Sequence, residues 1–335
     1  MFPALASQYV WLEKDDEPTD LQARLIINTE DENSSRKTTY DVAMRKNEIA
    51  FTTYAKNSKH ISLILGNGVS IPFGSEGWQD LVKNLLGQLQ PRFIERVDDI
   101  DKFLGENDLS TADFSFDMLN YYGCESQYWK ALKYSIYRRF NQNIWSDDSA
   151  LKAIAESKYK LKGSLLLYTY NYDVFLEKQY ERLYPEEKLI PITELSSIKV
   201  NDVPDNVVIH VHGVFLDDMD KGHDIVLSST DYFEQYHLPY ISKKMQCLFK
   251  SFQNDICLFI GSSMTDIFQM NMLAEALRQA EKSKAKQSVF ALMCLKDLKP
   301  KEKEAIYRYY VRKRIYLISF DDFETLPNKI RDLLN

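Results

Sequence analysis

The segment from Leu63 to Leu81 constrains the fold more than any other part of the chain. It reads LILGNGVSIPFGSEGWQDL: a short apolar run, a glycine-containing loop and an amphipathic helical pattern. This order is typical of doubly wound α/β domains, where the turn presents backbone N–H groups to a phosphate. Gly66 and Gly68 would let the backbone approach a pyrophosphate, and Ser70 could add a hydroxyl donor. The same glycines would equally serve a tight strand-to-helix turn.

Three further polar clusters each follow an apolar run that is predicted to be a buried parallel strand. They are Thr169-Tyr170-Asn171-Tyr172-Asp173, His210-Val211-His212-Gly213 and Gly261-Ser262-Ser263-Met264-Thr265-Asp266. Because the carboxyl ends of parallel strands meet at one edge of a sheet, we expect all four clusters to converge on one crevice of nucleotide size.

The alternation of patterns predicts an α/β fold, a Rossmann-like parallel sheet flanked by helices. Strands are expected at 61–66, 163–169, 207–211, 225–227, 256–261, 288–295 and 315–320. Helices are expected at 174–183, at 232–252 with a break near Pro239, at 267–284 and at 326–334. Between about 80 and 160 apolar residues recur at helical spacing with few glycines or prolines, which indicates an inserted helical module.

The chain divides into an N-terminal extension at 1–58 and a main domain at 59–335 that carries the insert. The extension contains a predicted strand at 23–29 and then a polar stretch without a clear pattern. It could be an extra edge strand, an oligomer arm or a partner-docking segment, and the sequence leaves these alternatives open.

Composition excludes several classes of function. The net charge of −7 and the pI near 5.4 argue against direct nucleic-acid binding, which usually needs a basic face. The N-terminus lacks the pattern of a signal peptide, and no apolar run approaches the roughly 20 residues of a membrane helix. The cysteines are scattered without a CxxC pair, which speaks against a disulfide framework and a zinc site. We therefore expect a cytoplasmic protein without metal or membrane contact.

Asn171 and His212 are the strongest candidates for chemistry. An asparagine amide both donates and accepts, so Asn171 could hold ribose hydroxyls or a water molecule. The ordinary pKa of histidine suits acid–base work near neutrality, and Gly213 leaves space beside His212 for a substrate. Alternation along the strand predicts that His210 and His212 share one face. A buried core histidine is the alternative reading.

Asp173 and the last cluster each have two readings. Asp173 could contribute to the pocket or could cap the helix that follows it. Gly261, Ser262 and Ser263, followed by Asp266, could bind a ribose or a phosphate at the start of the next helix, or could form an ordinary helix cap.

Taken together, the four clusters resemble the SIR2 (sirtuin-like) superfamily, and within it the SIR2-like NADase domains of bacterial anti-phage defence systems. The matching strings are GNGVSIPFG, TYNYD, HVHG and FIGSSMTD. LSSTDY at 227–232 and the C-terminal YLISFDDFETLPNKIRDLL are also similar to segments of such domains. The resemblance runs from about residue 60 to the C-terminus.

The resemblance implies that NAD⁺ is the substrate and that its nicotinamide–ribose bond is cleaved to nicotinamide and ADP-ribose. Asn171 would position a water molecule at the ribose, and His212 would be the base. The resemblance places the following residues around NAD: Gly66, Asn67, Gly68, Ser70, Thr169, Asp173, Gly213, Gly261, Ser262, Ser263 and Asp266.

The sequence also departs from the protein deacylases of this superfamily. Their zinc module of two CxxC pairs is absent, and Ser75-Glu76-Gly77 stands where they have an arginine. Asn67 replaces the usual alanine and Tyr170 replaces a glutamine. Water is therefore the expected nucleophile. A protein deacylase and a non-catalytic module that binds ADP-ribose or a related nucleotide are the alternatives.

An effector that depletes NAD⁺ to stop an infection must be silent at rest. We therefore expect activation by a sensor or activator subunit, or by assembly into a homo- or hetero-oligomer. The aromatic-rich helices at 116–145, with Tyr128, Trp129 and Tyr134, are the candidate contact surface.

Overall fold

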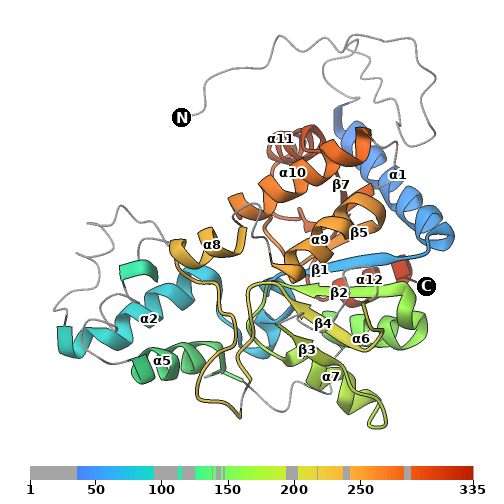
Figure 1. The fold of residues 1–335 in the computed structure, drawn as a ribbon. Coiled ribbons are helices and arrows are strands. Elements are labelled where there is room, and N and C mark those ends of the chain that lie inside the picture. The colour runs from blue at the N-terminus through green and yellow to red at the C-terminus, as the bar shows by residue number, and fades with distance from the viewer. Residues whose placement is uncertain are drawn as a thin grey trace.

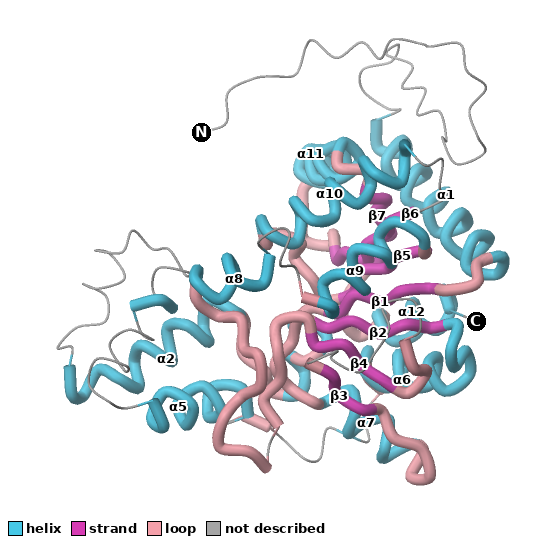
Figure 2. Tube along the Cα trace, in the orientation of Figure 1, coloured by secondary structure: helices cyan, strands magenta, loops and turns pink. Residues whose placement is uncertain are grey.

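The fold is a parallel α/β sheet (Figures 1 and 2). The computed structural model describes residues 36–93, 112–114, 125–137, 139–140, 145, 148–193, 203–216, 218–236, 242–282 and 288–334. Within these ranges seven strands form one sheet: β1 (Ile61–Leu65), β2 (Leu165–Thr169), β3 (Ile190–Ile192), β4 (Val207–His210), β5 (Ile256–Ile260), β6 (Ser288–Cys294) and β7 (Ile315–Phe320). Every strand pair is parallel. The predicted Rossmann-like α/β fold is confirmed.

The strand order is β3-β4-β2-β1-β5-β6-β7. Strands β2, β4 and β3 therefore lie on one side of β1, and β5, β6 and β7 lie on the other. Leu65, the last residue of β1, pairs with Thr169 of β2 and with Ile260 of β5. In open α/β sheets ligands bind outside the carboxyl ends of the strands where the order reverses. That position lies between β1 and β5.

Helices cover both faces of the sheet. The described helices of the chain are α1 (Arg36–Asn57), α2 (Trp78–Phe93), α5 (Glu125–Tyr137), α6 (Ala150–Leu161), α7 (Phe175–Leu183), α8 (Ser229–Tyr236), α9 (Lys243–Asn254), α10 (Ile267–Lys282), α11 (Pro300–Arg312) and α12 (Leu326–Leu334). Leu63 and Leu65 face the core formed with α6, α7 and α12, whereas Ile64 faces the core formed with α9, α10 and α11. Burial on both faces explains why the strands are continuous apolar runs.

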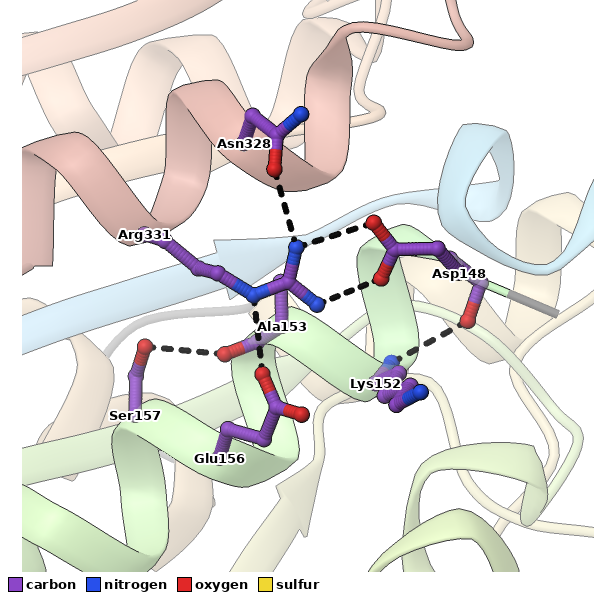
Figure 3. Close-up of polar contacts among 8 residues, drawn as sticks. Asp148, Lys152, Ala153, Glu156, Ser157, Asn328 and Arg331 are labelled. Carbon is purple, nitrogen blue, oxygen red and sulfur yellow. Dashed lines mark hydrogen bonds and ion pairs between the residues drawn. The ribbon is translucent and has the colours of Figure 1, made fainter. Parts of the chain in front are cut away.

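One arginine holds the C-terminal helix α12 against α6 (Figure 3). Arg331 Nε donates to Glu156 Oε2 at 2.8 Å, and its terminal nitrogens donate to both carboxylate oxygens of Asp148. The same side chain also donates to Asn328 Oδ1 at 3.1 Å. Paired hydrogen bonds of this kind give an arginine–carboxylate contact a fixed geometry, and they lower the pKa of Asp148.

Helix α1 occupies the second part of the segment that the sequence analysis separates as an extension. Phe51 is fully buried in the core, and the Asn47 side chain donates to Leu317 O of β7 at 2.9 Å. Residues 36–57 therefore pack as part of the α/β domain, and the expectation of a patternless polar stretch there is wrong. Its sparse apolar residues, such as Met44, face the core from an otherwise polar helix. The predicted strand at 23–29 lies outside the described residues.

The structure also corrects smaller expectations. No strand forms at 225–227, because Val226 N donates to His212 O at 2.9 Å within the loop that follows β4. Two elements are not predicted by the sequence pattern. One is β3, an edge strand that contains Pro191, and the other is helix α11. The predicted break near Pro239 lies between α8 and α9, outside the described residues.

Helices α2 and α5 belong to the predicted insert and lie to one side of the sheet, next to α8 (Figure 1). Leu81, Leu85 and Leu132 form an apolar core there with Tyr172 and Phe215, which belong to the loops after β2 and β4. The insert therefore packs directly on loops that carry predicted site residues. Helix α6, at the end of the predicted insert range, packs instead with α7 and α12 beside the sheet.

The three aromatic residues of the predicted contact surface do not share one exposed face. Tyr128 is buried, and Trp129 packs on Phe215 with 6.2 Å between ring centroids, whereas Tyr134 is 54% exposed. Tyr128 and Trp129 are therefore poor candidates for a partner contact. Residues 116–124, 138 and 141–144 of this surface lie outside the described residues. Among the described helices, none combines the length and apolar character that crossing a membrane requires.

Candidate active site at the carboxyl edge of the sheet

The glycine loops after β1 and β5 pack backbone against backbone. Gly66 N donates to Ile260 O at 2.9 Å, and Gly68 N donates to Gly261 O at 2.8 Å. A Cβ atom on Gly66 would lie 2.6 Å from Gly261 O, and Gly261 itself has φ +67°. Only glycine fits at this close approach. The loop contact alone thus accounts for these glycines, and their contact with a phosphate stays a prediction.

The loop after β1 is long and contains short helical turns. Two short 3₁₀ turns, 67–69 and 71–73, precede α2, which begins only at Trp78. Asn67 Oδ1 accepts from Ser75 Oγ at 2.7 Å, and Asn67 Nδ2 donates to Glu76 O. The Asn67 side chain therefore ties the loop back on itself. Helix α2 begins at Trp78, where the helical pattern of the sequence also begins, so its N-terminus does not follow Gly66 and Gly68 directly.

Asn171 connects the end of β2 to the β1 loop. Its Nδ2 donates to Gly66 O at 3.2 Å and to Ser70 Oγ at 2.9 Å, while its backbone N donates to Thr169 Oγ1 at 3.0 Å. Asn171, Ser70 and Thr169 are all buried. These bonds fix the orientation of the side-chain amide and commit its nitrogen to the protein, so that the amide oxygen is the atom that can accept from a ligand.

Asp173 stabilises the loop that carries Asn171. Its Oδ1 accepts from Phe175 N at 3.0 Å at the start of α7, which is the helix-capping reading of this residue. Burial raises the pKa of Asp173 to about 6, against the opposing effects of hydrogen bonds from Phe175 and Ser70. A buried carboxyl group beside Ser70 therefore belongs to the support of Asn171 as much as to a binding site.

The raised pKa of Asp173 predicts a specific pH dependence of stability. Because the folded-state pKa of about 6 exceeds the ordinary aspartate value of 3.8, this group stabilises the fold most below about pH 4, and that contribution is lost as the pH rises to 6. The difference in unfolding free energy between Asp173→Asn and wild type should therefore shift in favour of the variant by about 2–3 kcal/mol when the pH is raised from 4 to 7. Urea denaturation at both pH values measures this; an equal difference between the two proteins at both would contradict it.

His210 lies at the end of β4 and holds the neighbouring β2 loop. Its Nδ1 lies 3.1 Å from Asn171 O and its Nε2 lies 2.7 Å from Glu177 Oε1. A carbonyl oxygen only accepts, so Nδ1 carries a proton. His210 is fully buried and Glu177 is also buried. His210 therefore positions the backbone of Asn171 and faces no open space.

His212 has different surroundings, because β4 ends at His210 and the predicted alternation does not extend further. Its Nε2 lies 2.9 Å from Tyr236 Oη, and the ring of Tyr170 packs edge-on against it with centroids 4.6 Å apart. His212 is 4% exposed. Burial, with a smaller effect of Lys244, lowers its pKa to about 3, so the imidazole is neutral at physiological pH. A neutral imidazole can act as a base.

Asp266 connects the ends of β4 and β5. Its Oδ2 lies 3.9 Å from His212 Nε2, and its Oδ1 accepts from Phe268 N and Gln269 N at the start of α10. Asp266 is thus a helix cap that also faces the candidate base. With this contact the four strand ends form a closed circuit: β1 touches β5 and β2, β2 touches β4, and β4 touches β5.

The remaining predicted residues line the same loops. Ser262 Oγ accepts from Met264 N at 3.2 Å, and the hydroxyls of Ser263 and Thr265 lie 2.8 Å apart. Gly213 has φ +88°, and a Cβ atom there would lie 2.3 Å from Asp224 O. The contact with Asp224 alone therefore accounts for a glycine at 213, and the space that Gly213 would leave for a substrate stays a prediction.

Sequence reasoning misses the lysine that lies near His212. Lys244, on the first turn of α9, is 2% exposed, and its Nζ forms no hydrogen bond with any residue that the structure describes. The closest carboxylate among the described residues is Asp224 Oδ2, at 4.0 Å. Burial lowers the pKa of Lys244 to about 8. In the sequence Lys243-Lys244 resembles an ordinary solvated helix start, so only the structure identifies this group.

A matched pair of substitutions tests how costly this lysine is. Lys158 is equally buried, but its Nζ donates to Lys162 O at 2.9 Å and to Leu165 O at 2.6 Å. Lys158→Met should lower the unfolding free energy by about 2–3 kcal/mol, because two carbonyls lose their donor. Lys244→Met should be neutral or stabilising by about 1 kcal/mol. Urea denaturation compares them; an equal loss in both would contradict this account of Lys244.

Three tyrosine side chains enclose the candidate base. Tyr232 and Tyr236 of α8 and Tyr170 all lie beside His212, with ring centroids between 4.6 and 6.1 Å away. Tyr232 lies in LSSTDY, one of the strings that carry the resemblance, but the resemblance implied no role for this residue. Within the described residues, no group of three or more histidine, cysteine, aspartate or glutamate side chains could hold a metal ion.

Comparison with known proteins assigns the central part of the chain. A family model described as SIR2-like domain matches residues 165–317. The match begins with β2 and ends within β7, so it includes Asn171, His212 and the 261–266 loop, but not β1 and its glycine loop. No curated protein matches the chain. This match supports the resemblance to the SIR2-like superfamily, and three of the four strand-end motifs lie within the matched residues.

Proposed function

We propose that this protein is an NAD⁺ glycohydrolase that cleaves the nicotinamide–ribose bond. A SIR2-like domain indicates an activity that involves NAD. The observation that carries the finer proposal is the closed circuit of strand ends, because it brings the amide of Asn171 and the neutral imidazole of His212 into one connected cluster. Hydrolysis needs a positioned water molecule and a base, and these two groups can supply both functions.

Cleavage of this bond requires few catalytic groups. The positively charged nicotinamide is a good leaving group, and the bond breaks through an oxocarbenium-like state. The amide oxygen of Asn171 would accept a hydrogen bond from the attacking water, since its nitrogen is held by Gly66 and Ser70. His212 would take the proton that water releases. Fixed dipoles around the ribose would stabilise the developing charge without reorganisation.

The biological role that we propose is that of the effector of an anti-phage defence system, in which depletion of NAD⁺ stops phage production. This part of the proposal rests on the resemblance of the four motifs to SIR2-like NADase domains of such systems. It requires a trigger, and we propose a sensor or activator subunit, or assembly into an oligomer. The enclosed state of His212 is consistent with a protein that is silent at rest.

A nicotinamide-release assay tests the proposed activity. Purified full-length protein is mixed with NAD⁺, and free nicotinamide and ADP-ribose are followed by chromatography for wild type, Asn171→Ala and His212→Ala. Because the site is closed at rest, we expect slow release by wild type alone and loss of this release in both variants. Bound but intact nucleotide would favour a non-catalytic binding module. Release only in the presence of an acetylated peptide, together with its deacetylation, would favour a deacylase.

A further inference from the structure

Helix α8 covers the candidate base. Tyr236 Oη lies 2.9 Å from His212 Nε2, and Tyr232 Oη donates to Asp266 Oδ2 at 3.1 Å. Both tyrosine rings also pack on Phe268 of α10, with centroids 5.5 and 4.9 Å away. Two hydrogen bonds and a shared aromatic contact thus fasten one short helix over the point where the β4 and β5 loops meet.

The cover occupies one of the two ring nitrogens of the candidate base. A neutral imidazole has a single ring nitrogen that can accept a proton, and in the tautomer in which this is Nε2 the Tyr236 hydroxyl takes its place. The groups that face His212 are Tyr170, Tyr232, Tyr236, Asp266 and Lys244. With 4% of its surface exposed, His212 cannot reach a ribose unless part of this enclosure moves.

The same helix is tied to the inserted module. At its first residue, Ser229 N donates to Asp113 Oδ1 at 2.8 Å, and the Ser229 hydroxyl donates to the other carboxylate oxygen. Just before the helix, Leu227 is buried in the apolar core of the insert with Leu85 and Leu132. A shift of the insert would therefore pull on the start of α8, whose other end carries Tyr236.

We propose that α8 is an autoinhibitory latch, which holds the site closed at rest and is released when the inserted helices move. The inference rests on the proposed function, because it assigns the regulation of that site. The Asp113–Ser229 contact is the link between the insert, where a partner could act, and the Tyr232–Asp266 and Tyr236–His212 contacts that close the site.

The chemical reactivity of His212 reports the latch independently of catalysis. Diethyl pyrocarbonate modifies neutral, accessible imidazoles, and mass spectrometry of peptides separates His212 from the exposed His223, which serves as internal reference. The variants are Tyr232→Phe, which removes one closing hydrogen bond and keeps the ring, and Asp113→Ala, which cuts the link to the insert. Ser229→Ala replaces Asp113→Ala if the latter fails to fold.

Tyr180→Phe is the matched control, since Tyr180 Oη donates to Glu187 Oε2 at 2.7 Å on α7, outside the site. We expect His212 to be modified about tenfold faster in both latch variants and at the wild-type rate in Tyr180→Phe. Wild-type rates at His212 in the latch variants would overturn the latch.

Nicotinamide release measured on the same samples separates the two proposals. Faster modification of His212 together with faster release supports both. Faster modification with no release from NAD⁺ in any sample supports the latch as a closing device and overturns the proposed hydrolysis. Release by wild type with His212 reactivity unchanged in the variants leaves the hydrolysis standing and overturns the latch.

Discussion

Replacement of His212 by alanine is expected to lower nicotinamide release from NAD⁺ by about a hundredfold or more, because general-base catalysis typically contributes a factor of this size. The proposed base is already neutral, since burial lowers its pKa to about 3. In the closed state the imidazole is therefore neutral throughout the range from pH 5 to 8, whereas opening of the enclosure would remove the burial that lowers its pKa. The measurement is the initial rate of nicotinamide release, in wild type and in the Tyr232→Phe background, across that pH range.

His60 provides the control for this substitution. It precedes β1 at the opposite edge of the sheet, where its Nδ1 lies 3.3 Å from Gly163 O. His60→Ala should leave the rate of nicotinamide release within about twofold of wild type. Equal rates for wild type and His212→Ala in both backgrounds would remove His212 from the mechanism.

The second large effect concerns the fold beneath the site. Gly261→Ala should lower the unfolding free energy by about 3 kcal/mol or more. The residue adopts φ +67°, and a Cβ atom there would lie 2.7 Å from Val69 N and 3.0 Å from Gly68 C. An alanine would be strained in this left-handed backbone conformation, and its Cβ atom would push the β1 loop away from the β5 loop. Urea denaturation measures the change, and nucleotide binding should be lost with it.

Gly77→Ala is the matched substitution without these constraints. The Cβ atom of an alanine there would meet no heavy atom closer than Asp80 Oδ2 at 3.8 Å. This variant should be within about 1 kcal/mol of wild type, on either side. If Gly261→Ala proves as mild as Gly77→Ala, the two glycine loops are not packed as described.

The sequence predicted the sheet well because its strands are buried on both faces. The runs that contain Leu63, Leu167 and Leu258 are short, continuous and apolar, which is the local signature of parallel strands. Helix α1 escaped prediction because only a few of its residues, among them Phe51, face the core. The edge strand β3 escaped because Pro191 breaks the usual pattern.

The sequence indicates which residues are candidates for the site, but not which hydrogen bonds and contacts these residues make. That Asn171 and His212 follow neighbouring strands is visible from the order of the motifs. That the Asn171 nitrogen is held by Gly66 and Ser70, and that Tyr236 caps His212, depends on side chains 24 to 105 positions apart. No local pattern records such contacts. The same holds for Lys244, whose burial follows from the way α9 packs.

Hydrogen–deuterium exchange of the full chain, with and without ADP-ribose, tests most directly whether the four strand ends form one nucleotide site. In wild type and in Tyr232→Phe, we predict that the ligand slows exchange together in peptides covering 66–70, 169–173, 210–213 and 261–266. Slowing confined to one of these loops, or found only elsewhere in the chain, would contradict a shared site.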